Sequence, residues 1–277
     1  MFKVQWYPGH MTRAKRKIDA VLGTIDIIIE LRDARIPWSS GNPEISRLAK
    51  GKEHLIILNK KDLADARRTE EWLAYFEGAG VKALAICGTD KHDTQRVIRK
   101  LEESATEIFS KRRKKGLLDR PIRCMVLGIS NVGKSSFINS LAPRKVAITG
   151  DRPGVTKGNQ WVVVSKKVEL LDTPGILWPK FDGLVGPNLA LTGAISDQIY
   201  NVGEAVNYLL SLLREKMYLD PSTDSEEYVT DYAKKRGILV KGGCVDVEKA
   251  ALLLLKDFRG GKLGMITLES LKDHGLA

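Results

Sequence analysis

One stretch constrains the fold of this chain more than any other, namely GISNVGKS at residues 128–135. It matches the pattern G-x-x-x-x-G-K-S, whose glycines let a loop wrap so that successive backbone N–H groups point inward at a phosphate. The apolar run IRCMVL precedes it, and a helical pattern follows from about Lys134 to Leu141. The order strand, loop, helix favours an α/β fold, in which the helix N-terminus adds positive potential at the phosphate.

This loop supplies several candidate ligands for a nucleotide. Lys134 would reach the β- and γ-phosphates, and the Ser135 hydroxyl would coordinate Mg²⁺. We expect the nucleotide-binding residues here to be Ser130, Asn131, Val132, Gly133, Lys134, Ser135 and Ser136.

A second motif, DTPG, follows the apolar run KVELL. Its Asp172 is placed to hold Mg²⁺, usually through water, and the Gly175 N–H can meet the γ-phosphate. Between the two motifs lies RPGVTK, whose Thr156 could supply a magnesium ligand that is present only while the γ-phosphate remains. Thr149 is the competing candidate, and we favour Thr156 because it lies in the segment that resembles a switch loop.

A third motif, LNKKD, lies well before the phosphate loop and ends at Asp62. An aspartate after a parallel strand can accept hydrogen bonds from guanine N1–H and the exocyclic N2 amine. Adenine offers neither donor, and leaving a buried carboxylate unpaired costs on the order of 1–3 kcal/mol. Asp62 would therefore select guanine, while Asn59 braces the loop and the guanine edge, and Lys60 can lie along the base plane.

The next apolar run is followed by Cys87, Gly88 and Thr89. A backbone N–H at this place can support the guanine O6, although the sequence departs from the usual Ser-Ala-Lys. Together, the phosphate loop, DTPG and LNKKD predict that the nucleotide is GTP.

Apolar runs rich in β-branched residues alternate with helical patterns up to about residue 180. These runs cover residues 25–31, 54–58, 81–86, 122–127, 160–164 and 167–171. The alternation predicts a mostly parallel sheet with helices on both faces. Beyond residue 180 only amphipathic helical patterns remain, such as residues 202–213 and 247–258, which predict a small all-α domain.

The positive charge of the chain is unevenly distributed. Of 45 Lys and Arg against 34 Asp and Glu, residues 182–277 hold only 11 against 14, so residues 1–181 carry the whole excess. The excess concentrates in Arg13, Lys15, Arg16 and Lys17 and in the run KRRKK at residues 111–115. Such asymmetry favours a polyanionic partner such as nucleic acid, and the alternative is a solubilising surface.

Other classes of protein are disfavoured. No apolar run reaches the roughly 18–20 residues of a membrane helix, and the first residues lack the apolar core of a signal peptide. Cys87, Cys124 and Cys244 are too widely spaced for a disulfide framework or a zinc site, which fits a reducing cytosol.

The guanine motif precedes the phosphate loop, which reverses the usual order. With this order, the segments PGHM at residues 8–11 and DARIP at residues 33–37 resemble those of the circularly permuted GTPases, and among them the ribosome biogenesis GTPase A family. The resemblance spans essentially the whole chain. It implies a circularly permuted P-loop GTPase domain at residues 1–180 and a helical domain at residues 181–277 that contacts the ribosome or its RNA.

The resemblance also implies a function. A chain of this family would bind and hydrolyse GTP, with Mg²⁺, as an assembly factor for the large ribosomal subunit, docking in the GTP state and leaving after hydrolysis. The implied partners are the large subunit, ribosomal RNA and ribosomal proteins, in the cytoplasm and without a membrane. We expect a monomer away from the ribosome.

The residues that carry out hydrolysis are less clearly marked. Many GTPases place a glutamine after the DxxG motif to orient the attacking water, whereas this chain has Ile176. We therefore expect slow hydrolysis alone, stimulated by the subunit. The resemblance indicates His10 as a catalytic group, and an imidazole could orient water or accept a proton at neutral pH. With Lys134 of the phosphate loop and Thr156 of the switch-like segment, it makes up the expected catalytic set. The alternative is a turn histidine with a structural or RNA-facing role.

Asn131 raises a related possibility. In similar GTPases an asparagine at this position helps to bind K⁺, whose charge can stabilise the transition state. The alternative is an ordinary loop residue.

Two rival functions remain at this point. One is a non-catalytic, GTP-dependent RNA-binding scaffold, which the missing glutamine favours and the intact Lys134, Ser135, Asp172 and Asp62 disfavour. The other is a GTPase acting on transfer RNA or membranes. The acidic balance of residues 182–277 leaves open whether local basic patches such as Lys234-Lys235-Arg236 bind RNA or whether this part contacts ribosomal proteins.

Overall fold

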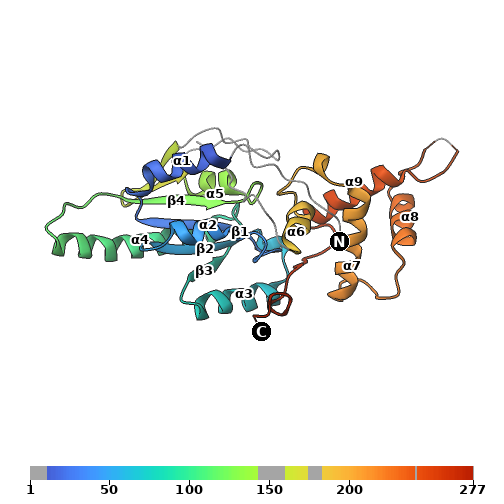
Figure 1. Cartoon of the computed structure of the whole chain (residues 1–277), viewed down its shortest axis with the longest axis horizontal. Helices are drawn as coiled ribbons and strands as arrows, with labels where there is room; N and C mark the ends of the chain where they lie inside the picture. The colour runs from blue at the N-terminus through green and yellow to red at the C-terminus, as the bar shows by residue number, and fades with distance from the viewer. Residues whose placement is uncertain (1–10, 143–159, 174–182, 241, 277) are drawn as a thin grey trace.

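A computed structural model describes residues 11–142, 160–173, 183–240 and 242–276 (Figure 1). In it, one sheet has the strand order β3-β2-β1-β4-β6-β5. The strands are β1 (Ile27–Asp33), β2 (Glu53–Asn59), β3 (Lys82–Ala85), β4 (Ile122–Gly128), β5 (Gln160–Ser165) and β6 (Val168–Asp172). Neighbouring strands are parallel except for the antiparallel pair β5 and β6. The predicted mostly parallel sheet is confirmed.

The middle of this sheet brings the sequence motifs to one edge. All seven residues of β1 are buried, as expected for a central strand with helices on both faces. The register pairs Asp33 with Asn59, Leu31 with Gly128, and Val126 with Asp172. Because parallel strands end at the same edge of a sheet, the ends of β1, β2, β4 and β6 lie together.

Helices cover both faces of the sheet (Figure 1). They are α1 (Met11–Leu22), α2 (Pro43–Leu48), α3 (Ala66–Gly78), α4 (Lys91–Lys114) and α5 (Lys134–Leu141), with a short 3₁₀ turn η1 (Lys61–Leu63). Alternate residues of a strand point to opposite faces, so Ile28 packs with α1 and α2 whereas Ile29 packs with α4 and α5. The helices α3 and α4 begin after Asp65 and Asp90, whose carboxylates accept backbone N–H groups of the first turn.

The last part of the chain is helical, as predicted. It contains α6 (Val185–Leu191), η2 (Asp197–Ile199), α7 (Val202–Glu215), α8 (Ser225–Lys235), α9 (Val247–Arg259) and η3 (Leu271–His274). One antiparallel bridge joins Leu239 to Val245 between α8 and α9. After α9 the chain returns toward the sheet, where the Ile266 N–H donates to Leu63 O and the Leu268 N–H donates to Arg35 O.

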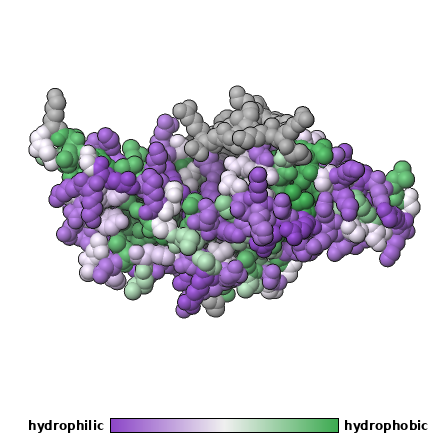
Figure 2. Space-filling view, turned by 180° about the vertical axis from the view of Figure 1, so that it is seen from behind, coloured by the Kyte–Doolittle hydropathy of each residue, from purple (hydrophilic) through white to green (hydrophobic). Residues whose placement is uncertain are grey.

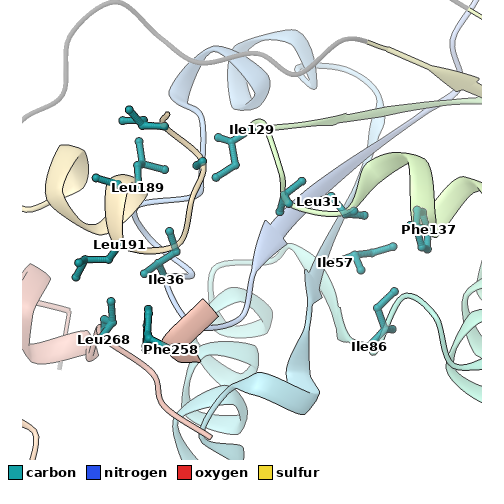
Figure 3. Packing of buried hydrophobic residues seen from close by; sticks show 14 of the residues in the cluster. Leu31, Ile36, Ile57, Ile86, Ile129, Phe137, Leu189, Leu191, Phe258 and Leu268 are labelled. Carbon is teal, nitrogen blue, oxygen red and sulfur yellow. The ribbon is translucent and has the colours of Figure 1, made fainter. Parts of the chain in front are cut away.

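The apolar core runs without a break from the sheet into these helices. One buried cluster contains Leu31 and Ile57 of the sheet together with Leu189 of α6 and Phe258 of α9 (Figure 3). Figure 2 shows that hydrophilic residues predominate on one face of the molecule, with hydrophobic residues in smaller groups. Within the described residues, no helix is long and apolar enough to cross a membrane.

Candidate nucleotide-binding site

The phosphate loop connects β4 to α5 in the predicted way. Gly133 immediately precedes α5 with a φ of 97°, and Asn131 is also left-handed, with a φ of 57°. A Cβ on Gly133 would lie 2.5 Å from Asn59 Nδ2, so this position requires glycine for both its conformation and its space. The α5 N-terminus therefore lies directly behind the loop, where it favours an anion.

Lys134, the first residue of α5, is buried inside the loop. Its Nζ donates to Gly128 O at 3.2 Å and to Ile129 O at 2.7 Å. Burial lowers the pKa of Lys134 to about 8, although the charge of Asp172 acts in the opposite direction. The ammonium is thus held by carbonyl groups at the place where a polyphosphate would supply stronger acceptors.

Asp172 ends β6 on the other side of this loop. Its Oδ1 is buried and accepts no hydrogen bond from any described residue. Burial raises the pKa of Asp172, and the opposing effects of Lys134 and of the Thr173 N–H are smaller. A buried carboxylate oxygen without a partner fits a hard cation such as Mg²⁺, which takes oxygen ligands. Ser135, in the first turn of α5, is the second described residue that could hold this ion.

Asn59 joins the base-reading and phosphate loops. This side chain is 3% exposed at the end of β2, where its Nδ2 donates to Val132 O at 2.8 Å. Its Oδ1 accepts the Gly88 N–H, also at 2.8 Å. Asn59 therefore braces two loops at once, which is more than the motif alone predicts.

Lys60 follows in the left-handed conformation, with a φ of 62°. Its Nζ donates to Asn131 O at 2.7 Å and lies 3.0 Å from Asp33 Oδ2. Burial lowers the pKa of Lys60, whereas the attraction of Asp33 raises it by less. The lysine side chain thus spans from the guanine motif to the phosphate loop, and its position along a bound base stays a prediction.

Asp62 is exposed in η1, where a base could reach its carboxylate. In the loop after β3, two of the three predicted amides are already used inside the protein. The Cys87 N–H donates to Asp93 Oδ2 at 2.8 Å, and the Gly88 N–H donates to Asn59. Thr89 is exposed, so we expect its amide to be the one that supports the guanine O6.

Sequence reasoning missed three residues that support these loops. Asp33 and Arg35 form a buried ion pair, with Arg35 Nη2 at 2.8 Å from Asp33 Oδ2. Burial alone would raise the pKa of Asp33, but Arg35 and Lys60 together hold it well below its usual range. Asp93 pairs with Lys61 Nζ at 2.7 Å and so fixes the loop after β3. Asp33 and Arg35 belong to the DARIP segment, where two opposite charges two residues apart, directly after an apolar strand, were the available signal.

Some predicted residues fall outside the described part of the chain. These are His10, Thr149, Thr156 and Gly175. In the basic helix α1, only the Arg16 side chain among the four predicted cations is described, and it is exposed. The roles assigned to all these residues stay predictions.

Comparisons with known proteins bear on the site. A family model described as "50S ribosome-binding GTPase" matches residues 123–241, which include the phosphate loop and Asp172. Ribosome biogenesis GTPase A of Bacillus pumilus is 45% identical over 96% of this chain and 98% of its own length. The same protein of Thermotoga maritima is 32% identical over 98% of this chain and 95% of its own length.

Solved structures agree with these relatives. The crystal structure of GNP-bound YlqF from T. maritima has a TM-score of 0.72 and 27% identity, and it covers 93% of this chain and 98% of its own. GDP-bound YlqF gives a TM-score of 0.68 at 28% identity, over 93% of this chain and all of its own.

Proposed function

The chain belongs to the ribosome biogenesis GTPase A family, and on that premise we propose that it is a GTP-hydrolysing assembly factor for the large ribosomal subunit. The observation that carries this proposal is the meeting of the three motifs at one sheet edge. Asn59 hydrogen-bonds Val132 O of the phosphate loop and the Gly88 N–H of the loop after β3, so base and phosphates can be held by one rigid frame. Lys134 and Asp172 lie where phosphates and Mg²⁺ would be bound.

We assign the magnesium site to Ser135, Asp172 and Thr156. Bound Mg²⁺ would neutralise charge that develops on the phosphate oxygens during hydrolysis. Lys134 contributes positive charge at the same oxygens, and the loop amides orient them. Asn131 would hold a K⁺ ion, which would supply further positive charge in the transition state. GTP turnover in potassium buffer should exceed that in sodium buffer, and equal rates would contradict the role of K⁺.

Hydrolysis requires a group that orients the attacking water. Ile176 has no polar atom in its side chain, so another residue must supply this group. We assign this role to His10, whose imidazole can orient water or accept a proton at neutral pH. Turnover should be slow alone and stimulated by the large subunit. The test is the GTP turnover of His10→Ala with and without that subunit. Rates that match the unsubstituted protein under both conditions would remove His10 from catalysis.

The proposed switch follows from the order of the motifs along the chain. We divide the chain into a GTPase domain at residues 1–180 and a helical domain at residues 181–277. The segment after DTPG, which would sense the γ-phosphate, then leads directly into the helical domain. We propose that GTP favours a conformation that docks on ribosomal RNA, and that loss of the γ-phosphate lowers this affinity and releases the factor.

Sedimentation with purified ribosomal subunits tests this function. In a non-hydrolysable GTP analogue, the protein should pellet with the large subunit, and in GDP it should remain largely in the supernatant. Lys134→Ala should lose this dependence on nucleotide because it weakens phosphate binding. Binding to generic RNA that ignores the nucleotide would instead support a non-catalytic RNA-binding scaffold. A cytoplasmic monomer away from the ribosome is the state we expect for such a factor.

A further inference from the structure

The lysine of the guanine motif is connected to the C-terminal helices by an ion triad, in which Asp33 and Arg35 are buried and Lys60 is partly buried. Lys60 Nζ lies 3.0 Å from Asp33 Oδ2. The same carboxylate receives two donors from Arg35, with Nε at 2.9 Å from Oδ1 and Nη2 at 2.8 Å from Oδ2. Asp33 and Arg35 are 2% and 1% exposed, so water cannot replace either partner.

The third side of the Arg35 guanidinium faces the helical part of the chain. Its Nη1 donates at 3.2 Å to the carbonyl of Arg259, the last residue of α9. A cation is favoured at a helix C-terminus, where carbonyl groups lack helical partners. The guanidinium also lies over the Phe258 ring, with Cζ 5.6 Å from the ring centroid. Because a guanidinium is planar and rigid, the end of α9 and the Asp33 carboxylate orient each other through Arg35.

A second connection starts at the phosphate loop and reaches the same residue. Asn131 Nδ2 donates to Gly193 O at 2.7 Å. The segment that carries Gly193 is held by the Arg259 side chain, whose Nε donates to Leu191 O at 3.0 Å and whose Nη2 donates to Ala190 O at 2.9 Å. Arg259 also pairs with Asp197 at 2.7 Å.

The two connections close into a ring, because Lys60 Nζ also donates to Asn131 O at 2.7 Å. The ring runs from Lys60 through Asp33 and Arg35 to the Arg259 backbone. It returns from the Arg259 side chain through the segment at residues 190–193 to Asn131. A movement of either side of the ring must therefore be accommodated by the other side.

From this ring we infer that Arg35 and Arg259 are positioning residues that couple nucleotide binding to the placement of the C-terminal helices. Neither is among the residues assigned above to nucleotide binding. They act on Lys60 and Asn131, which lie on the base and phosphate sides of the site. This inference rests on the proposed GTP-binding function. By reciprocity, a partner that shifts α9 changes nucleotide affinity, and nucleotide binding changes the affinity for that partner by the same factor.

The rate of release of a fluorescent GDP derivative from the full-length protein tests the coupling. Arg35→Lys keeps the charge but loses the forked geometry, so release should become about 5- to 10-fold faster, within the range typical of coupled sites. Arg259→Lys should have a similar effect. Because both act through one ring, the double variant should release GDP more slowly than the product of the two single effects predicts.

Arg236→Lys is the matched control. Arg236 pairs with the buried Asp257 of α9 and lies over the Tyr232 ring, inside the helical part. Its substitution should disturb the contact with α9 inside the helical part and lower the thermal midpoint, yet leave GDP release within about 2-fold, well below the coupling range.

Three outcomes would contradict the proposed coupling, and a fourth would contradict the proposed function instead. The first is unchanged release from Arg35→Lys, the second is equal acceleration by Arg236→Lys, and the third is strict multiplication in the double variant. If the unsubstituted protein binds no GDP, the proposed function fails before the coupling is reached.

Discussion

Lys134 shows at the residue scale how the fold prepares a phosphate site. Lys134 is 7% exposed, and its ammonium is bonded only to carbonyl groups among the described residues. Burial lowers the pKa of this lysine to about 8, below its ordinary 10.5. The protein without nucleotide therefore holds a cation in a place that disfavours its charge, and a polyphosphate relieves this cost when it binds.

The lowered pKa of Lys134 also makes the stability of the folded protein depend on pH. Between about pH 8 and pH 10.5, the unfolded chain binds more protons at Lys134 than the folded protein does. The contribution of Lys134 to the free energy of unfolding therefore rises with pH in this window and is least favourable below pH 8. Urea denaturation at pH 7.5 and pH 9.5 should show the unsubstituted protein gaining stability relative to Lys134→Met. The exposed Lys167, changed to Met, serves as control. Parallel changes in all three proteins would contradict the prediction.

At the scale of elements, Asn59 holds together loops that the chain carries far apart. A Cβ on Gly88 would lie 2.7 Å from Asn59 Oδ1, so Gly88→Ala must displace this side chain. The buried amide would lose its bonds to both loops. We expect the free energy of unfolding to fall by about 1–3 kcal/mol and GTP affinity to fall with it. Urea denaturation and nucleotide titration measure the two effects.

Gly78→Ala provides the comparison for that substitution. Gly78 is the last residue of α3, and a Cβ there meets no atom within 4 Å. Alanine at this position should leave stability unchanged or raise it slightly, because it restricts the unfolded chain. Equal losses in the two variants would show that the contact with Asn59 is not the cause.

At the scale of the whole molecule, the end of α4 and the helix α8 lie at opposite ends of an elongated shape (Figure 1). The basic residues at the end of α4 differ in whether they pair with a carboxylate. Arg112 pairs with Asp26 at 2.5 Å and Arg113 pairs with Asp119. Lys111, Lys114 and Lys115 are exposed, and among the described residues none of these lysines forms an ion pair. The lysines, rather than the arginines, are therefore available to an RNA phosphate backbone.

Substitution of these three lysines by Gln should weaken binding to the large subunit. The slope of the logarithm of affinity against the logarithm of salt concentration should become shallower by about 2 to 3, because three phosphate contacts are lost. Arg112→Gln should chiefly lower stability, since it leaves Asp26 with one partner fewer. Sedimentation across a salt series measures the first effect and urea denaturation the second. An unchanged salt slope in the triple variant would exclude these lysines from RNA binding.

The sequence by itself determined the class of fold, the family and the positions of the phosphate and guanine motifs. These features depend on short patterns: apolar runs of strand length, a glycine loop before a helix, and a carboxylate after a strand. Each pattern is local, so it survives the change in motif order.

Only the tertiary structure decided which donors and acceptors are still available for a ligand. In the folded protein, the Cys87 and Gly88 amides already donate to side chains of the protein, and Arg112 and Arg113 pair with carboxylates. The tertiary structure also joins Arg35 to Arg259, 224 residues away. Such partners are brought together by the packing of α9 against the end of the sheet, and no local pattern records a contact over that distance.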